Sequence, residues 1–559
     1  MVRNWYSRYS FLLTCLAVVA WNHHAYAADI DAGPSDYQAA VQSLQPGDTL
    51  HLASGTYPNL LVIQNLNGSD SAWITIEGPA SGEPATFTAD PGPCCNTVEI
   101  LNSSYVAIKN LTVDGNGVGG AFGVSAKGST NNLVHHITVE GCTFLGHDAG
   151  QQTVAISTKT PTWGWTIRGN RIVGAGTGMY LGNSNGNDPF VAGLIEYNLI
   201  ADTVGYNLEV KWQNPRPDVA GMPTGPSSTI IRHNVFLKND RPSPDGDRPN
   251  LLVGGFPTSG AGADDLYEIY GNVFHHNPRE SLLQASGRVS IHDNVFVDVD
   301  GTAILLRNHD LPLLFARVYN NTVYGAGRGI HLGSSAAQGA SVFGNLVFAA
   351  DPISGNIDDE RDNLVDSVAN AAQYVAAPST TLGAMDFYPL AGKCEGSAID
   401  LSSASTDLNY ELDFNGTSKG GFTFRGAYAG DGTNPGWPID EDIKDPSGGS
   451  AGGAGGSGGA GGTAGSGGTS GAGGTSGAGG TSGAGGSAGV AGGGGTGGAS
   501  AGSGGGTSST GGSSGTTASA SNEDDGGCSC RTSSSRGSMA MAWLGLLALV
   551  GLARRRRSD

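Results

Sequence analysis

The stretch Ile167-Arg168-Gly169-Asn170-Arg171-Ile172 contains the pattern that decides the fold, which reads aliphatic-x-x-Asn-x-hydrophobic. The pattern returns with Asn198, Asn234, Asn272, Asn294, Asn321 and Asn345 at its fourth place, at intervals of 28, 36, 38, 22, 27 and 24 residues. A repeat of this length, with longer intervals where loops are inserted, indicates a solenoid. The runs between are short, β-type and without helical periodicity. We therefore predict an all-β, single-stranded, right-handed parallel β-helix whose coils stack at ~4.8 Å.

The repeated Asn has a structural role in such a fold. Asn tolerates the left-handed backbone conformation of a corner, and its amide can bond to the Asn of the next coil. The pattern weakens toward the N-terminus, where Cys142 and Leu111 take the place of Asn, and we expect roughly ten coils in all. Ser35 and Gln38 form a capping-box pattern, and the apolar residues that follow predict a short N-terminal helix that caps the first coil.

The N-terminal part of the chain also resembles a known family. After the capping segment come Pro46-Gly47-Asp48-Thr49-Leu50, Gly55-Thr56-Tyr57 and Ala72-Trp73-Ile74-Thr75-Ile76. This order is similar to the start of pectate-lyase-like β-helix proteins, and most similar to polysaccharide lyase family 6, the alginate lyases and chondroitinase B. The asparagine repeat extends the resemblance to about residue 350. Such a resemblance is specific for a fold and much less specific for an activity.

Composition divides the 559 residues into four segments. Residues 1–27 combine Arg3 and Arg8, an apolar run and an A-x-A site, the pattern of a cleaved secretion signal. Residues 28–445 are the predicted β-helix domain. Residues 446–527 are nearly all Gly, Ser, Ala and Thr, and predict a disordered linker. Residues 528–559 contain Cys528-Ser529-Cys530, an apolar stretch shorter than a usual membrane span, and an Arg run.

The last segment resembles the MYXO-CTERM sorting tail of myxobacterial surface proteins. That resemblance implies processing near Cys528 or Cys530, and the alternative is a marginal membrane anchor with its Arg run in the cytoplasm. Both interpretations place the β-helix outside the cytoplasm, at the cell surface or outer envelope, or released from it. Export permits disulfides, and one hypothesis pairs Cys142 with Cys94 or Cys95.

The formal net charge is −20, but it is unevenly distributed. Residues 28–167 hold 3 basic and 12 acidic side chains, residues 329–445 hold 5 and 17, and residues 168–328 hold 13 and 16. A polyanion would therefore be tolerated only by the central coils. Nucleic acid is excluded as a partner for so acidic a chain. We expect a monomer that meets an acidic polysaccharide and, through its tail, a membrane or the cell envelope.

The longest intervals of the repeat, between Asn198 and Asn272, predict where a binding site would lie. Inserted residues in a solenoid become loops on one face, which is often the binding face. The residues that we expect to contact a sugar there are Trp212, Arg216, His233 and Arg241. Asn207, Glu209 and Lys211 are expected to project outward together beside these loops.

Family 6 lyases place a catalytic Lys on an outward strand position with Asn and Glu ligands to calcium nearby. By that resemblance Lys211 is the base, Glu209 and Asn207 are calcium ligands, and Arg232 or Arg248 binds the substrate carboxylate. The family's Arg-His-Gly after the Lys strand is missing, because the matching strand reads Asn250-Leu-Leu-Val-Gly-Gly255. The activity implied is β-elimination on an acidic polysaccharide.

A second hypothesis is a non-catalytic adhesin or glycan-binding stalk. The long linker, the acidic ends and the broken lyase motif favour it, whereas the dense loops and the basic middle favour an enzyme. Residues 360–445 have weak repeats and predict irregular coils with a C-terminal cap, in which Phe422–Tyr428 is expected to form a final strand.

Overall fold

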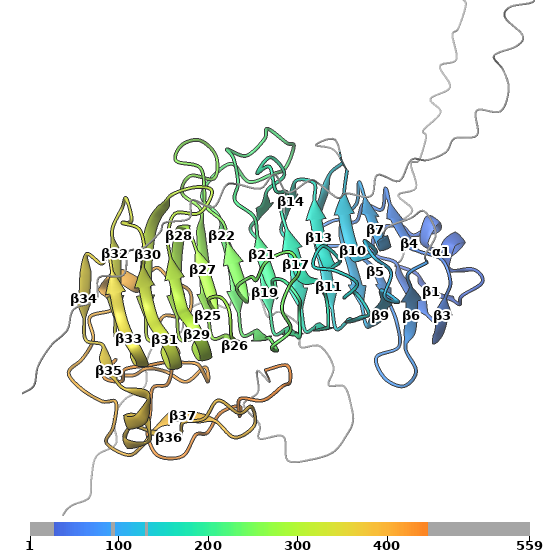
Figure 1. Cartoon of the computed structure of the whole chain (residues 1–559). Coiled ribbons are helices and arrows are strands. Elements are labelled where there is room, and N and C mark those ends of the chain that lie inside the picture. Colours follow the sequence, from blue (N-terminus) through green and yellow to red (C-terminus); the bar gives the residue numbers. More distant parts are fainter. Residues whose placement is uncertain (1–26, 91–95, 129–131, 445–559) are drawn as a thin grey trace, which may run out of the picture. The chain divides into compact units, whose positions relative to one another are not determined.

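The computed structural model describes residues 27–90, 96–128 and 132–444, and these residues form the predicted right-handed parallel β-helix (Figure 1). One wall of the solenoid is a parallel sheet, here called sheet A, with one strand from each successive coil. Short strands β14 (Thr162–Trp163) and β18 (Phe190–Val191) extend it at one edge. Its main path runs β1 (Asp29–Ala32), β2 (Thr49–Leu52), β5 (Ile74–Glu77), β8 (Ser104–Lys109), β11 (Val134–Glu140), β15 (Thr166–Arg168), β19 (Leu194–Glu196), β22 (Ser228–Arg232), β25 (Leu266–Tyr270), β28 (Gly287–His292), β30 (Leu313–Tyr319), β32 (Ala340–Phe343) and β34 (Asp359–Arg361).

The opposite side is a second parallel sheet, sheet B, to which most coils contribute twice, so that it consists of two rows. Row B1 contains β3 (Gly55–Tyr57), β6 (Ala85–Thr88), β9 (Leu111–Asp114), β12 (Thr143–Leu145), β16 (Arg171–Val173), β20 (Leu199–Ala201), β23 (Val235–Leu237), β26 (Val273–Asn277) and β35 (Leu364–Asp366). Row B2 contains β4 (Leu61–Gln64), β7 (Asn96–Leu101), β10 (Phe122–Lys127), β13 (Val154–Lys159), β17 (Thr177–Leu181), β21 (Leu208–Val210), β24 (Leu251–Val253) and β27 (Leu283–Ala285). The long strands β29 (Val295–Leu306), β31 (Thr322–Leu332) and β33 (Leu346–Gly355) run through both rows.

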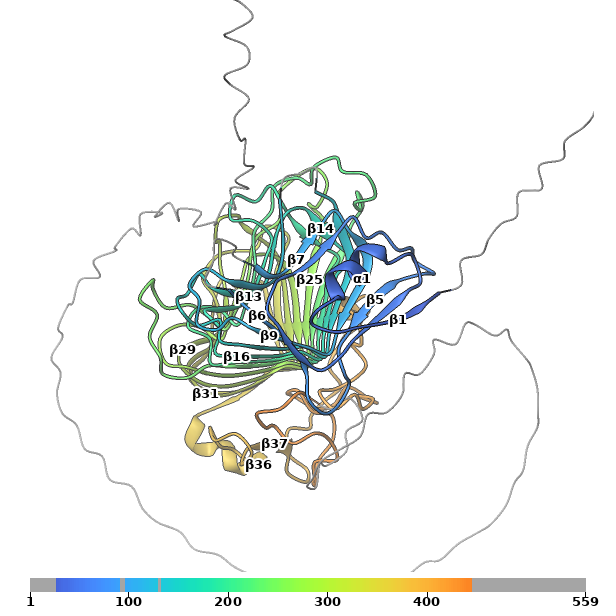
Figure 2. The same cartoon turned by 90° about the vertical axis from the view of Figure 1, so that its right-hand side faces the viewer.

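The core lies between the two sheets, as the view along the stack shows (Figure 2). Alternate residues of each short strand point inward, such as Ile167 of sheet A, Ile200 of row B1 and Val210 of row B2, all completely buried. The main path of sheet A gives thirteen levels within the described residues, where the sequence led us to expect ten. The additional levels lie at the two ends of the stack, at β1 and β2 and at β34, which precedes Asn363.

The seven predicted Asn residues form an inward-facing asparagine ladder, and all are completely buried. Each Nδ2 donates to Oδ1 of the next Asn at 2.9 to 3.0 Å, and the ladder ends one residue beyond the prediction, at Asn363. The left-handed conformation belongs to the residue before each Asn, so our assignment of it to Asn itself is wrong. These preceding residues are Gly or, as at Tyr197 and His233, residues with φ of 52° and 56°.

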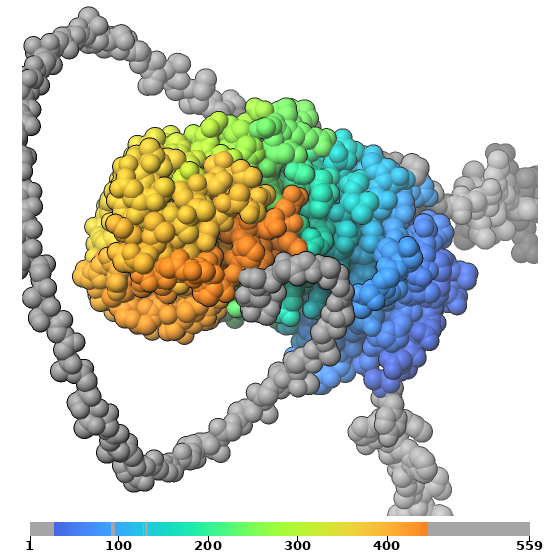
Figure 3. Space-filling model, turned by 90° about the horizontal axis from the view of Figure 1, so that it is seen from below, coloured from blue at the N-terminus to red at the C-terminus, as the bar shows by residue number. Residues whose placement is uncertain are grey.

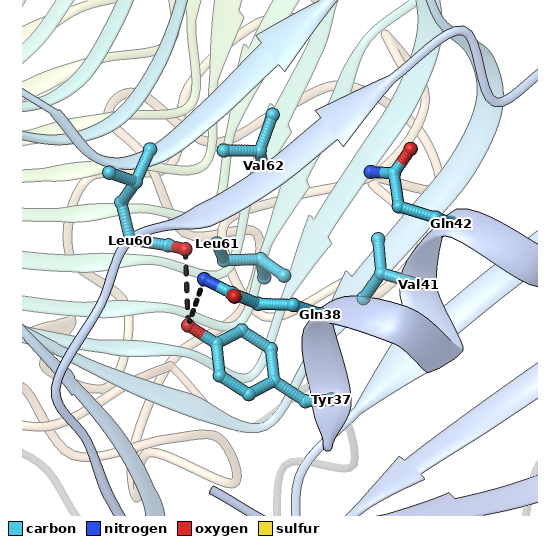
Figure 4. Close-up of a pocket in the computed structure, with 7 residues that line it drawn as sticks. All are labelled: Tyr37, Gln38, Val41, Gln42, Leu60, Leu61 and Val62. Atoms are coloured by element: carbon cyan, nitrogen blue, oxygen red, sulfur yellow. Dashed lines mark hydrogen bonds between the residues drawn. The ribbon is translucent and has the colours of Figure 1, made fainter. Parts of the chain in front are cut away.

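The N-terminal cap forms as predicted, as helix α1 (Tyr37–Ser43). Tyr37 and Val41 are buried, and the Tyr37 ring lies 5.1 Å from Tyr57 and 5.5 Å from Phe87, centroid to centroid. The capping box is wrong, because the N-cap is Asp36, whose side chain accepts from the backbone of Gly33 and makes no hydrogen bond to the helix. A shallow pocket of about 200 Å³ lies between α1 and β4 and has no charged side chain in its lining (Figure 4).

Residues 366–444 fold back over the outer face of row B1, beneath the stack in Figure 1 and toward the viewer in Figure 3. This segment includes the 3-10 helices η1 (Val368–Gln373) and η2 (Ser402–Ala404) and the antiparallel pair β36 (Val375–Ala377) and β37 (Asp386–Pro389). Its apolar side chains, such as Phe387 and Tyr428, cover outward residues of B1 such as Val235 and Val273. Our expectation of a strand at Phe422–Tyr428 is wrong, because this part makes only an isolated bridge at Phe424.

Several predictions concern residues outside the described ranges, namely nearly all of the secretion signal, the linker, the sorting tail and the pair Cys94 and Cys95. Cys142 is a free, buried thiol at the corner where the asparagine ladder begins, so the disulfide predicted for it is wrong. No helix in the described ranges has the length and apolar character needed to span a membrane.

Candidate functional site

Strand β21 places Glu209 and Lys211 on the outer surface of row B2, as the sequence predicts. Leu208 and Val210 alternate with them and are completely buried in the core. The Lys211 ammonium lies 2.9 Å from Glu209 Oε1, and the side chains are only 11 % and 3 % exposed, so the pair is well enclosed although it faces outward. We call this surface, with Lys159 and Tyr180, the Lys211 face.

Asn207 does not share this surface, and the expectation that it projects outward is wrong. It is completely buried, and its Nδ2 donates to the backbone carbonyls of Ile200 and Leu237 at 3.2 and 2.9 Å. These bonds hold the corner between rows B1 and B2, where the chain turns into β21. The alternation of the strand therefore begins only after Asn207, at Leu208, because the Asn207 amide bonds to backbone groups of the corner.

Two further residues of row B2 complete the Lys211 face. Tyr180 pairs with Glu209 in the register of β17 and β21, and its ring centroid lies 5.4 Å from the Lys211 ammonium. The ammonium of Lys159 approaches the same ring, at 5.3 Å from the centroid. Lys159 and Tyr180 were not singled out from the sequence. The only signal is that Lys159 ends a β-type run, and its relation to Lys211 becomes visible only when the coils are aligned.

One edge of the Lys211 face is a rim of loops that follow the B2 strands. Trp212 packs against Gly186, where an added Cβ would lie 2.5 Å from the indole. The backbone N of Asn214 donates a hydrogen bond to the carbonyl of Gly186, in the same loop that Trp212 contacts, at 2.8 Å. Trp212 is thus half-buried beside Lys211, and its contact with a sugar stays a prediction.

Arg216 is not available in this way, and its assignment to substrate binding is wrong. Its side chain is 1 % exposed and forms an ion pair with Asp265, and its NH1 donates to the carbonyls of Pro223 and Gly225. These bonds join two loops of the rim to each other. Arg241 remains exposed on another loop and pairs with Asp148 at 3.0 Å.

Arg248 lies at the opposite edge of row B2 from Lys211. Its guanidinium carbon is 5.8 Å from the ring centroid of Tyr206, which precedes β21, and its backbone carbonyl accepts from Lys238 at 2.9 Å and from Asn277 at 3.1 Å. Burial lowers the pKa of Lys238 to about 8. The structure therefore brings Arg248 to the same row as Lys211 but to the other end of the strand.

Arg232 and His233 do not belong to this surface, because β22 is a strand of sheet A. Arg232 is the last member of a charge ladder, an outward column of alternating sign that also contains His51, Glu77, Lys109, Glu140, Arg168 and Glu196. Its Nε donates to Glu196 at 2.6 Å and its NH1 to the Tyr270 hydroxyl at 2.9 Å. The expectation that Arg232 could bind a substrate carboxylate beside Lys211 is therefore wrong.

His233 is held beneath the C-terminal segment. Its ring stacks on Tyr197 at 5.0 Å between centroids, and its Nδ1 lies 3.3 Å from the Lys444 ammonium. Burial, Lys444 and Arg232 together lower the pKa of His233 well below its ordinary value. His233 is thus a packing residue of the corner, and its predicted contact with substrate is wrong.

The immediate surroundings of Lys211 are acidic as well as basic. Besides Glu209, the carboxylate of Asp310 lies within the electrostatic reach of Lys211. The pKa of Asp310 is held below its ordinary value by a hydrogen bond from His309 and, to a smaller extent, by the charge of Lys211. Opposite charges favour the charged form of an ammonium group. The Lys211 side chain therefore has two carboxylates near it.

The predicted calcium ligands do not converge on one point. The Asn207 amide faces the corner, and the Glu209 carboxylate is paired with Lys211. Calcium requires six to eight oxygen ligands. Across the described ranges, no group of three or more His, Cys, Asp or Glu side chains is arranged to hold a metal. The residues therefore do not fit calcium as we expected, and we derive no chemistry through it.

Comparison with known proteins agrees with this architecture. The family model described as "Right handed beta helix region" matches residues 96–347, which include all of the Lys211 face. No curated protein sequence matches the chain.

Solved structures with a similar fold include three polysaccharide lyases. An alginate lyase from Paenibacillus sp. str. FPU-7 is 16 % identical, covers 61 % of this chain and 99 % of its own, and has a TM-score of 0.31. A mannuronic acid specific family 6 lyase from human gut microbiota is 12 % identical, with coverages of 60 % and 83 % and a TM-score of 0.32. A pectate lyase is 11 % identical, with coverages of 74 % and 92 % and a TM-score of 0.32. With TM-scores below 0.5, these structures carry no argument about this chain.

Proposed function

We propose that this protein binds an acidic polysaccharide on the Lys211 face and cleaves it by β-elimination, with Lys211 as the base. The observation that carries the proposal is the enclosed Lys211–Glu209 pair on the outer surface of row B2, with an aromatic ring at 5.4 Å and a second Lys beside it. Aromatic faces and basic groups suit a sugar chain that carries carboxylates.

The reaction would run as follows in terms of atoms. Lys211 Nζ, in its neutral form, takes the proton from the carbon next to the carboxylate of a uronate. The electron pair left behind forms a carbon–carbon double bond, the bond to the glycosidic oxygen breaks, and that oxygen takes a proton from water. Because only the neutral amine can accept a proton, cleavage should become faster as the pH rises.

A second function is favoured by the same ion pair. A Lys that stays charged binds anions but cannot accept a proton, so the surface would serve as a glycan-binding site on a non-catalytic stalk. In either case we propose that the secretion signal and the C-terminal tail place the domain at the cell surface, where labelling of intact cells with an antibody to the β-helix domain would detect it.

Ultraviolet absorbance of unsaturated uronate distinguishes the two functions. The full chain is mixed in turn with alginate, pectate, chondroitin and heparin, and the experiment is repeated with Lys211→Ala. The matched control is Lys109→Ala, which removes a Lys–Glu pair of 3.1 Å from the outer surface of sheet A. A rise in absorbance that Lys211→Ala abolishes and Lys109→Ala preserves supports the lyase. Binding without any rise supports the stalk, and neither binding nor cleavage refutes both.

A further inference from the structure

We propose that Lys159 binds the anionic group of the substrate beside Lys211, with Gly182 between the two Lys residues in the register of row B2. This inference rests on the proposed function, since it supplies the positive charge that β-elimination needs at the carboxylate. The sequence assigned that task to Arg232 or Arg248, but Arg232 is bound in the charge ladder of sheet A and Arg248 lies at the far edge of row B2.

The register of row B2 puts the three residues in one outward column. Thr158 pairs with Leu181, and Leu181 pairs with Val210, so the residues that follow them, Lys159, Gly182 and Lys211, occupy successive coils. Coils stack at ~4.8 Å, which places the two Lys backbones about 10 Å apart with Gly182 between them. The backbone bond from Lys211 N to the Leu181 carbonyl, at 2.8 Å, continues this register past the end of the strand.

Both ammonium groups lie near a ring of the coil between them, and that of Lys159 is also 5.7 Å from the ring centroid of Phe122 on the preceding coil. They lie 5.3 and 5.4 Å from the centroid of the same ring, that of Tyr180, which is two residues before Gly182 on the same outward side. Cation–π contacts of this length favour a fixed position of each ammonium. The ring therefore holds the two positive groups on either side of the Gly182 position.

Gly182 is the residue of the middle coil, between the two Lys residues of the column. An added Cβ would stand 3.3 Å from Cβ of Lys211, closer than such contacts usually are, and 3.5 Å from the Asp188 carbonyl, so a side chain here would crowd Lys211. The φ of Gly182 is 93°, a conformation that other residues rarely adopt. The turn geometry and the close approach of Lys211 thus both favour Gly at this position.

A polar group without a partner lies in the neighbouring outward column, which also contains Tyr180 and Glu209. Ser157 precedes Lys159 by two residues and pairs with Tyr180 in the register, and its side chain is completely buried. Its hydroxyl has no hydrogen-bond partner, which is unusual for a buried polar atom. A carboxylate or sulfate bound between the two Lys residues would supply hydrogen-bond acceptors close to these ammonium and hydroxyl donors.

The roles then divide between the two Lys residues. Lys159 stays charged and neutralises the carboxylate of the sugar unit that reacts, while Lys211 removes the neighbouring proton. This arrangement selects a glycan that carries an acidic group on the reacting sugar unit. A neutral glycan would lack the electrostatic attraction to Lys159 and would bind more weakly.

Affinity electrophoresis of the full chain, in gels that contain alginate, pectate, chondroitin or an uncharged glucan, measures this role separately from cleavage. Lys159→Gln should weaken binding to the acidic glycan roughly 10- to 100-fold, the value of one charge-assisted hydrogen bond. Lys159→Arg, which keeps the charge, should recover most of it, and Lys109→Gln on sheet A should bind like the wild type. Lys159→Met, which keeps the apolar stem over Tyr180, replaces Lys159→Gln if that variant does not fold.

The outcomes separate this inference from the proposed function. If Lys159→Gln binds the acidic glycan as the wild type does, or weakens charged and uncharged glycans equally, Lys159 has no role in anion binding, and cleavage that depends on Lys211 can still stand. If the wild type neither binds nor cleaves any acidic glycan, the proposed function itself fails.

Discussion

Replacing Arg232 by Ala tests whether this residue stabilises the fold or takes part in the chemistry. The guanidinium of Arg232 donates to Glu196 Oε2 at 2.6 Å and to the Tyr270 hydroxyl at 2.9 Å. Glu196 has a side chain only 2 % exposed, and Arg168 holds its other oxygen at 2.5 Å. The substitution therefore leaves one carboxylate oxygen of Glu196 without its donor, although Arg168 still supplies a counter-charge. The Tyr270 hydroxyl loses the shorter of two bonds and still accepts from Asn409 at 3.3 Å.

The expected loss of stability follows from these contacts. A hydrogen bond to a charged group contributes about 1.5–3 kcal/mol, and a buried polar atom left without a partner costs a similar amount. Because Arg168 still compensates Glu196, the loss should lie toward the lower end. We expect Arg232→Ala to reduce the free energy of unfolding by about 2 kcal/mol.

Equilibrium unfolding in urea, followed by intrinsic fluorescence, measures this loss. A double-mutant cycle with Glu196→Gln should give a coupling energy of about 1 kcal/mol or more, because the two residues share the bond. The control is Arg241→Ala, which breaks an exposed pair with Asp148 and should cost under about 1 kcal/mol. Unchanged stability of Arg232→Ala, together with lost glycan cleavage, would refute the structural role and restore the catalytic one.

Three further results are expected. Asn234→Ala should lower the free energy of unfolding by about 3 kcal/mol in the same urea titration, because it strands buried donors and acceptors on two coils, and Asn363→Ala, at the half-buried end of the ladder, should cost less. Addition of a chelator should leave glycan binding in affinity gels unchanged. A loss of glycan binding would show that calcium binds Glu209 in place of Lys211. Burial disfavours the charged ring of His276, but its bonds to Asp298 and Asp240 raise its pKa. The stability advantage of the wild type over His276→Asn should therefore be full at about pH 5 and vanish as the pH rises through the folded pKa, as thermal unfolding at each pH would show.

The sequence predicted the parts of this fold that depend on local, repeated chemistry. The Asn corner recurs with its own hydrophobic neighbours, so seven of its positions could be recognised without knowledge of any long-range contact. The outward positions of Glu209 and Lys211 followed from the alternation of a strand in the same way. Asn207 departed from that alternation because the corner before β21 needs its amide.

Several site residues were missed or misplaced because the sequence does not show which sheet each strand joins. Arg232 and Lys211 lie 21 residues apart, and nothing local reveals that a sheet boundary falls between them. Lys159 precedes Lys211 by 52 residues and two loops of unequal length, so their common column appears only in the register of row B2. Arg216 looked like a loop residue facing solvent, whereas its partner, Asp265, lies in another loop.

The position of the site also follows from what occupies the other outer surfaces. The outward column at the end of the sheet A strands is taken first by the charge ladder and then by a stack of rings, in which Tyr270 and His292 lie 4.8 Å apart. The outer surface of row B1 turns apolar from Leu199 onward and is covered by residues 366–444. Row B2 is bordered by the long loops and carries Lys159 and Lys211 on its outward side. A sugar chain therefore finds basic and aromatic groups together on this row, which is why we place both binding and cleavage there.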